Sequence, residues 1–322
     1  MELVSVIIVT HNQKNLLFRC LDSVRLQSYP KIEILVIDDY SQDGTFKEIK
    51  DKFSNIKIIV NEDEKLLSSS QNIGIKNTQG RFIFFLENDV ILEENYTEEL
   101  VKTFEYDPRI GMVVGKILRM DRITLDSTGL FLGRSRKPIE RGFNQKDNGQ
   151  YMKSEYIFGV GQVAGIFRRE LLEDIKLDGE YFDENYGIFY EDLDLAWRAN
   201  LLGWKAYYNP KAVAYHIRGA TTRTRLLHLR FFNKYYLPCI SKNLQFHYIK
   251  NRYMTIIKNE SLMDYLKNIG YILLYELKLW TYILFFYPEI FLKLPQIIKS
   301  LGIAFRKRKS LRLLRKSHFP KI

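Results

Sequence analysis

Carboxylates and a histidine stand at three separate places in the chain where they could act together. Asp89 closes an apolar run, the pair Glu191 and Asp192 opens a later helical pattern, and His216 ends a further apolar segment. Carboxylate oxygens and an imidazole nitrogen can bind a divalent cation, and a carboxylate can also accept a proton from a hydroxyl group. The sequence therefore contains the parts of a site that holds a cation and removes a proton.

The segments around these residues alternate between strand and helix patterns. Val4 to Thr10 is a β-branched run that predicts a buried strand, and helical spacing of apolar residues follows it. Further strand patterns lie at 32–37, 56–60 and 82–86. This alternation predicts an α/β fold, a Rossmann-like and mostly parallel sheet with helices on both faces. Ligands bind at the carboxyl ends of the strands in such a sheet, and Asp89 lies at one of them.

The alternation stops after residue 118. Residues 119–155 are polar and contain several glycines, so we expect a variable excursion or a flexible loop over the site. Strands at 162–167 and 204–208 and a helix from Glu191 to Leu202 follow, and from about residue 222 we expect helices only.

Two familiar classes of nucleotide-binding protein are excluded by the loop after the first strand. Thr10 to Lys14 reads Thr-His-Asn-Gln-Lys, which lacks the glycines of a dinucleotide-binding oxidoreductase, and no P-loop motif occurs in the chain. Cys20 and Cys239 are the only cysteines, so neither a disulfide framework nor a zinc site is expected, and the compartment expected is the reducing cytoplasm.

Five segments, in order, resemble the family 2 glycosyltransferases, and the likeness covers about residues 3–220. They are Val4–Asn12, Val36–Thr45, Asn72–Gly74, Gly80–Asp89 and Tyr190–Asp194. The resemblance implies a GT-A fold and an inverting transferase that uses a nucleotide-sugar donor (a dTDP-, UDP- or GDP-sugar) and a divalent cation, Mg²⁺ or Mn²⁺. It also implies a catalytic domain over residues 1–221, with a donor-binding half at about 1–118 and an acceptor half at about 156–221.

The resemblance also implies roles for particular residues. Asp89 and His216 are the expected metal ligands, Asp192 is the expected base, and Glu191 is expected to orient the base or the acceptor. The donor pocket is expected to include Thr10, Asp39, Asn72, Glu87 and Asn88, with Asp39 at the nucleobase.

Simpler explanations of these acids stay open. Glu87 departs from the Asp-x-Asp pattern that family members often have, Asp89 could cap a loop, and acids such as Asp192 gather in the first helical turn because the helix dipole favours them. Asp194 and Arg198 are spaced to pair on one helix face.

The carboxyl-terminal region, 222–322, combines aromatic and apolar helical patterns with a basic tail. The uncharged part of Tyr271–Tyr287 is shorter than a membrane span, and every charged residue from Lys293 onward is a lysine or arginine. This pattern predicts a membrane-associating region, bound peripherally to the inner face of the cell membrane. No nucleic-acid module accompanies the tail, so no nucleic acid is expected as a partner. A helical cap that packs on the catalytic domain or on a second subunit is the alternative.

Taken together, the sequence predicts transfer of one sugar to a hydroxyl of a surface glycan, with a lipid-linked glycan as the expected acceptor. The layout is most similar to that of rhamnosyltransferase-like members. Two other hypotheses stay open. One is a nucleotidyltransferase on a similar sheet, and the other is a catalytically silent module that binds a sugar nucleotide or a glycan.

Overall fold

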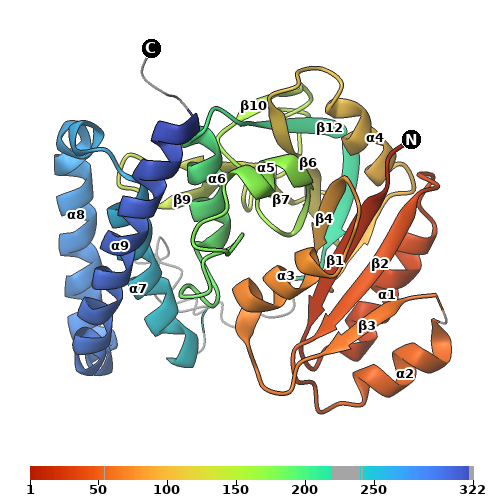
Figure 1. Cartoon of the computed structure of the whole chain (residues 1–322), viewed down its shortest axis with the longest axis horizontal. Coiled ribbons are helices and arrows are strands. Elements are labelled where there is room, and N and C mark those ends of the chain that lie inside the picture. The colour runs from red at the N-terminus through yellow and green to blue at the C-terminus, as the bar shows by residue number, and fades with distance from the viewer. Residues whose placement is uncertain (54, 219–239, 241, 319–322) are drawn as a thin grey trace.

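A mixed sheet forms the centre of the protein, which we describe from a computed structural model over residues 1–53, 55–218, 240 and 242–318 (Figure 1). The strands follow the order β10-β12-β6-β11-β4-β1-β2-β3, and β5 and β7 pair at its side. Of these eight, only β10 and β11 run against the others. The strands are β1 (Val4–Thr10), β2 (Ile32–Asp38), β3 (Lys57–Val60), β4 (Phe82–Leu86), β5 (Val90–Leu92), β6 (Ile110–Arg119), β7 (Leu125–Ser127), β10 (Glu155–Ile157), β11 (Ala164–Arg168) and β12 (Lys205–His216).

Helices cover this sheet, as the strand and helix alternation predicts. All but one residue of β1 and every residue of β4 are buried, and because successive side chains point to opposite faces, both faces must be covered. The helices of this part are α1 (Lys14–Arg25), α2 (Thr45–Lys52), α3 (Leu66–Lys76), α4 (Tyr96–Thr103), α5 (Arg169–Asp174) and α6 (Glu191–Leu201). The prediction of a mostly parallel α/β sheet is confirmed.

The expectation of a flexible loop at 119–155 is wrong. The segment contains β7, a two-stranded sheet of β8 (Leu130–Leu132) and β9 (Pro138–Glu140), and β10 at the edge of the main sheet. Each of these strands has three residues, too few for an alternation of apolar and polar residues to stand out. The strand predicted at 204–208 also continues as β12 to His216, through a register shift between Asn209 and Val213 next to Pro210, which has no N–H to give to a ladder.

The described part of the carboxyl-terminal region is helical, as predicted. It consists of α7 (Lys242–Asn259), α8 (Leu262–Phe286), a short 3₁₀ helix (Pro288–Lys293) and α9 (Leu294–His318). α7 and α9 lie between α6 and the outermost helix, α8 (Figure 1), and a second hydrophobic cluster joins the region to α6 and the turn before it, with Tyr186, Tyr190 and Leu193 packed with Ile249 and Met254. The region is therefore a cap on the rest of the protein. The expected boundary at 221/222 and Cys239 lie outside the described residues.

Candidate active site

The loop after β4 is fixed by two hydrogen bonds to neighbouring strand ends. The backbone N–H of Glu87 donates to the carbonyl oxygen of Val163 at 2.9 Å, and Asn88 Nδ2 donates to Thr10 Oγ1 at 2.9 Å. Thr10 and Asn88 meet because β1 and β4 are parallel neighbours whose carboxyl ends reach the same edge of the sheet. Asp89, the next residue, is buried at this edge.

His216 reaches this loop through a strand pairing. β5 begins directly after Asp89 and pairs antiparallel with the end of β12, so that Val90 lies opposite His216. The imidazole Nε2 is 3.2 Å from Glu87 Oε2 and 3.2 Å from Asp89 Oδ1. One ligand atom from each of the three residues lies within 4.8 Å of the other two. Two carboxylates and one imidazole suit a small divalent cation such as Mn²⁺ or Mg²⁺, so these residues fit the cation that the family implies.

Asp126 on β7 orients His216 through the ring nitrogen that faces away from Glu87 and Asp89. Its Oδ2 atom is 2.8 Å from His216 Nδ1, and its Oδ1 atom accepts from Arg218 Nε at 2.5 Å. Asp126 is fully buried. A carboxylate on one ring nitrogen fixes the tautomer and turns the other nitrogen toward a metal, so this arrangement leaves Nε2 facing Glu87 and Asp89.

Neighbouring charges lower the pKa of Asp126 and raise the pKa of His216. Burial raises the pKa of Asp126, but the hydrogen bond from His216 and the charge of Arg218 outweigh it, and the pKa lies below its ordinary value. Burial lowers the pKa of His216, but hydrogen bonds to Asp126, Asp89 and Glu87 outweigh it, and the pKa lies well above its ordinary value. The cluster therefore favours positive charge at its centre, as a cation site must.

The predicted base stands at the start of α6. Glu191 and Asp192 form its first turn, directly after two residues with left-handed backbone, Phe189 (φ +70°) and Tyr190 (φ +69°). Burial raises the pKa of Asp192 to about 6, and the charge of Glu87 adds to this shift. Burial and the charge of Asp192 raise the pKa of Glu191 well above its ordinary value. A carboxylate with a raised pKa binds a proton more strongly, which suits a general base.

Three observations place Asp192 near the cation cluster. Glu87, a member of that cluster, contributes to the raised pKa of both Glu191 and Asp192. A Cβ on Gly161 would lie 3.6 Å from Asp192 Oδ2, and Gly161 is two residues from Val163, which accepts the N–H of Glu87. The charges of Asp126 and Asp192 also add to the effect of burial in raising the pKa of Glu140, so both carboxylates lie near Glu140. Asp192 and the cluster thus share one edge of the sheet.

Two of the expected donor-pocket residues form their hydrogen bonds within the protein. Asp39 accepts from the backbone N–H groups of Lys65 (2.9 Å) and Leu66 (3.0 Å), at the start of α3, and from Asn61 Nδ2 (2.7 Å). Asn72 on α3 is fully buried, and its amide donates to and accepts from the backbone of Phe182. Both side chains hold together the loops that surround the site.

Asp126 and Glu140 are site residues that sequence reasoning missed. Both belong to the segment 119–155, and Glu140 Oε2 accepts from Arg218 at 2.7 Å. Neither follows a recognisable strand pattern or a motif, so the only available signal was the presence of acids in a segment next to the site.

Comparison with known proteins identifies the family of this chain. The family described as glycosyl transferase family 2 matches residues 5–176. Glycosyltransferase GlyA of Streptococcus pneumoniae is 31% identical over 228 residues, which cover 67% of this chain but 30% of GlyA. A dolichyl N-acetyl-α-D-glucosaminyl phosphate 3-β-D-2,3-diacetamido-2,3-dideoxy-β-D-glucuronosyltransferase of Methanococcus voltae is 27% identical, over 69% of this chain and 70% of its own length. The chain thus spans less than a third of GlyA.

Solved structures share the fold. The mannosyltransferase PcManGT from Pyrobaculum calidifontis, solved with GDP-Man and Mn²⁺, has a TM-score of 0.50 and 15% identity, and the match covers all of this chain and 88% of that one. GalNAc-T7, solved with UDP, GalNAc and Mn²⁺, has a TM-score of 0.55 and 19% identity over 67% of this chain and 43% of its own. The GT-A fold and the family predicted from the sequence are confirmed, and the chain belongs to glycosyl transferase family 2.

Proposed function

We propose that the protein is an inverting glycosyltransferase that moves a sugar from a nucleotide-sugar donor to an acceptor hydroxyl. One observation carries this proposal. A cluster suited to a divalent cation and a carboxylate with a raised pKa occupy the same edge of the sheet, with Glu87 as the link between them. Displacement at an anomeric carbon needs a cation to stabilise the leaving phosphate and a carboxylate to accept the proton of the incoming hydroxyl.

Glu87, Asp89 and His216 would hold the cation, Mn²⁺ or Mg²⁺, which supplies positive charge for the departing nucleoside diphosphate. Asp126 holds the imidazole so that Nε2 faces the two carboxylates. Glu87 therefore takes a place in the metal group, beyond the donor contact expected from the sequence.

Asp192 would accept the proton of the acceptor hydroxyl. With a pKa of about 6, its carboxylate is ionised near neutral pH and is a stronger base than an exposed aspartate. Glu191, one residue earlier and buried, would orient the base or the acceptor. Attack from the side opposite the leaving phosphate inverts the configuration of the anomeric carbon.

The donor would lie along the carboxyl ends of β1, β2 and β4. Thr10 and Asn88, which hydrogen-bond to each other, line this edge together with Asp39 at the end of β2. Asp39 and Asn72 support the proposal as residues that hold the pocket in place, because their side chains bind the loops at 61–66 and at Phe182. A UDP-, GDP- or dTDP-sugar fits such an edge by its phosphates and its ribose.

The acceptor is proposed to be a glycan, carried on a lipid, at the inner face of the cell membrane. α8 is 25 residues long, and 22% of an 18-residue apolar stretch within it is buried. The helix is therefore longer than the uncharged part of Tyr271–Tyr287 that was compared with a membrane span above. By length and composition it could cross a membrane. Exposed lysines and arginines on the neighbouring α9 would attract anionic lipid, and they are Lys299, Arg306, Lys309, Arg312, Arg315 and Lys316.

The test uses the full-length protein with Mn²⁺ or Mg²⁺ and a panel of UDP-, GDP- and dTDP-sugars. Release of a nucleoside diphosphate, abolished by Asp192→Asn and by chelation of the cation, supports the proposal. Formation of a nucleoside triphosphate and a sugar 1-phosphate after addition of pyrophosphate would instead indicate a nucleotidyltransferase. Binding of a donor with no turnover, with and without a lipid-linked glycan extract, would indicate a silent binding module.

A further inference from the structure

We infer that α7 positions the catalytic base, with Asn251 and Lys258 holding the turn that leads into Glu191 and Asp192. This inference rests on the proposed function of Asp192. The two residues belong to the carboxyl-terminal cap, outside the segment 5–176 that the family match covers. They are positioning residues, because they contact the backbone and the carboxylates on either side of the base.

The turn that they contact has an unfavourable backbone. Phe189 (φ +70°) and Tyr190 (φ +69°) both have left-handed conformation, which bulky residues adopt rarely because it is strained. Tyr190 is the residue directly before α6, so its backbone sets the direction in which Glu191 and Asp192 leave the turn. Such a conformation persists only where surrounding contacts hold it.

Asn251 supplies contacts of this kind. Its side chain is fully buried, and Nδ2 lies 2.9 Å from the carbonyl oxygen of Tyr186 and 2.8 Å from those of Ile188 and Phe189. One amide group with two N–H bonds therefore serves three carbonyls of a single turn. These carbonyls converge on Asn251 only while the turn keeps its left-handed residues.

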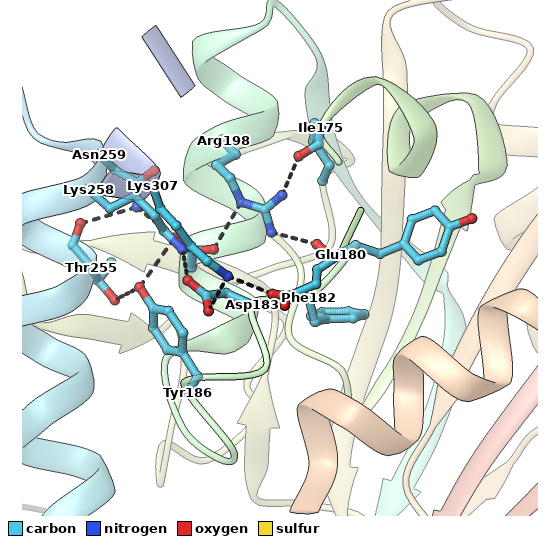
Figure 2. A network of polar contacts seen from close by, with 12 residues as sticks. Ile175, Glu180, Phe182, Asp183, Tyr186, Arg198, Thr255, Lys258, Asn259 and Lys307 are labelled. Carbon is cyan, nitrogen blue, oxygen red and sulfur yellow. Dashed lines mark hydrogen bonds and ion pairs between the residues drawn. The ribbon is translucent and has the colours of Figure 1, made fainter. Parts of the chain in front are cut away.

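Lys258 holds both ends of the same segment. Its ammonium group, almost fully buried, is 2.7 Å from Asp183 Oδ2 and 2.8 Å from Asp194 Oδ1 (Figure 2). Asp183 precedes the turn, and Asp194 is two residues after the base. Asn259 Nδ2 also donates to Asp194 at 2.8 Å, and Lys307 from α9 is 2.7 Å from Asp183 Oδ1.

The charges of this network are matched. Burial raises the pKa of Asp183, but Lys258 and Lys307 outweigh it, and the pKa lies below its ordinary value. The pKa of Asp194 is likewise lowered by Lys258 and Arg198 against the effect of burial. Both aspartates are therefore ionised and bound to the cap, and they fix the ends of the segment whose middle carries the base.

The experiment compares Asn251→Ala with Tyr253→Phe, a matched control on the same helix. Tyr253 donates from its hydroxyl to Glu276 on α8, at 2.5 Å, and accepts from Trp280 Nε1, so its hydroxyl is bound to α8 rather than to the turn within the described part of the chain. We expect Asn251→Ala to lower kcat about 10–100-fold with little change in the donor KM, since a base displaced by about 1 Å loses rate on this scale. Tyr253→Phe should change kcat less than about twofold. Asn251→Ser, which keeps one donor, should give an intermediate kcat.

Two further measurements distinguish positioning from general stability. Phe189→Gly makes the left-handed backbone easy to adopt, so Asn251→Ala should cost less in kcat when combined with it than alone. Hydrogen exchange of the amides at 187–194 should be about tenfold faster in Asn251→Ala than in Tyr253→Phe. Equal kcat and equal exchange in these two variants, or strictly additive losses with Phe189→Gly, would overturn the inference.

Failure of the proposed function can be distinguished from failure of the inference about Asn251. If the unmodified protein turns over no nucleotide sugar of the panel, the proposed function fails, and the exchange comparison alone then decides whether Asn251 holds the turn.

Discussion

His216 is held on both sides by carboxylates, and this arrangement gives the site its chemistry. Nε2 faces Glu87 and Asp89, while Nδ1 faces Asp126. Asp89 and His216 were expected as metal ligands from the sequence, whereas Glu87 was expected only in the donor pocket. Asp126 was not predictable from the sequence, because it reaches the histidine only through the pairing of β7 with β6.

Asp126→Asn should weaken Mn²⁺ binding about 10–100-fold, since loss of a carboxylate behind a ligating histidine costs affinity on this scale. The measurement is a Mn²⁺ titration followed by electron paramagnetic resonance. Asp121→Asn is the control, because Asp121 lies in an exposed turn of the same segment, where it accepts hydrogen bonds from residues 123 and 124. Equal affinities in the two variants would contradict the role of Asp126.

The raised pKa of Asp192 predicts a pH dependence of the rate. The base must be ionised to accept a proton, so kcat/KM should rise with pH through about 6 and then level off. A plot of kcat/KM from pH 4.5 to 8.5 tests this, with Asp192→Glu as a comparison that keeps a carboxylate. A rate that is constant across this range would show that another group acts as base.

The same shift predicts that Asp192→Asn stabilises the protein. A carboxyl group whose pKa is raised on folding binds its proton more strongly in the folded state, so its contribution is lost as pH rises through about 6. At pH 7–8 the variant should be more stable by about 1–2 kcal/mol, and the difference should vanish below about pH 4. Thermal unfolding at both pH values measures this, and no gain at pH 8 would contradict the assigned environment.

Strand and helix elements were predictable where they are long and apolar. Continuous apolar runs predict β1 and β4. The three-residue strands β7, β8 and β9 are too short to show a pattern, and they form by pairing with strands that are distant in sequence. The cap was only the alternative to a membrane-associating region, although its helices were predictable from their apolar periodicity. Its attachment to α6 was not predictable, because it depends on buried pairs such as Lys258 with Asp194.

α8 presents an apolar surface that predicts membrane binding. Leu277 (67% exposed) and Leu284 (56% exposed) lie seven residues apart on one face. Leu277→Glu with Leu284→Glu should weaken binding to vesicles of phosphatidylcholine and phosphatidylglycerol by about tenfold or more. The control is Leu26→Glu, at an equally exposed leucine (71%) after α1. Unchanged sedimentation with vesicles in the double variant would contradict a membrane role for α8.

At the scale of the whole molecule, the cap and the sheet part share one set of buried contacts. Lys307, which the sequence places in the exposed basic tail, is in fact bound to Glu180 and Asp183. Some cations of the tail are thus exposed, and at least one, Lys307, is buried in the network of Figure 2. An independent carboxyl-terminal domain would not need such pairs.

Lys258→Met should therefore destabilise the whole protein. The substitution keeps the length of the side chain but removes the cation that Asp183 and Asp194 share, and this loss costs about 1–3 kcal/mol even though Lys307 and Arg198 remain. Thermal unfolding should show a lower Tm in one shared transition of sheet and cap. Two transitions, with that of the sheet part unchanged, would contradict the shared core.

The central claim is that one cation cluster and one base act on the same anomeric carbon. Crystals grown with Mn²⁺ and the donor identified by the nucleotide-sugar panel test it most directly, through the anomalous signal of manganese. The account predicts manganese between Glu87, Asp89 and His216, with the diphosphate on it and the far side of the anomeric carbon open toward Asp192. Manganese bound elsewhere, or Asp192 on the same side as the diphosphate, would contradict it.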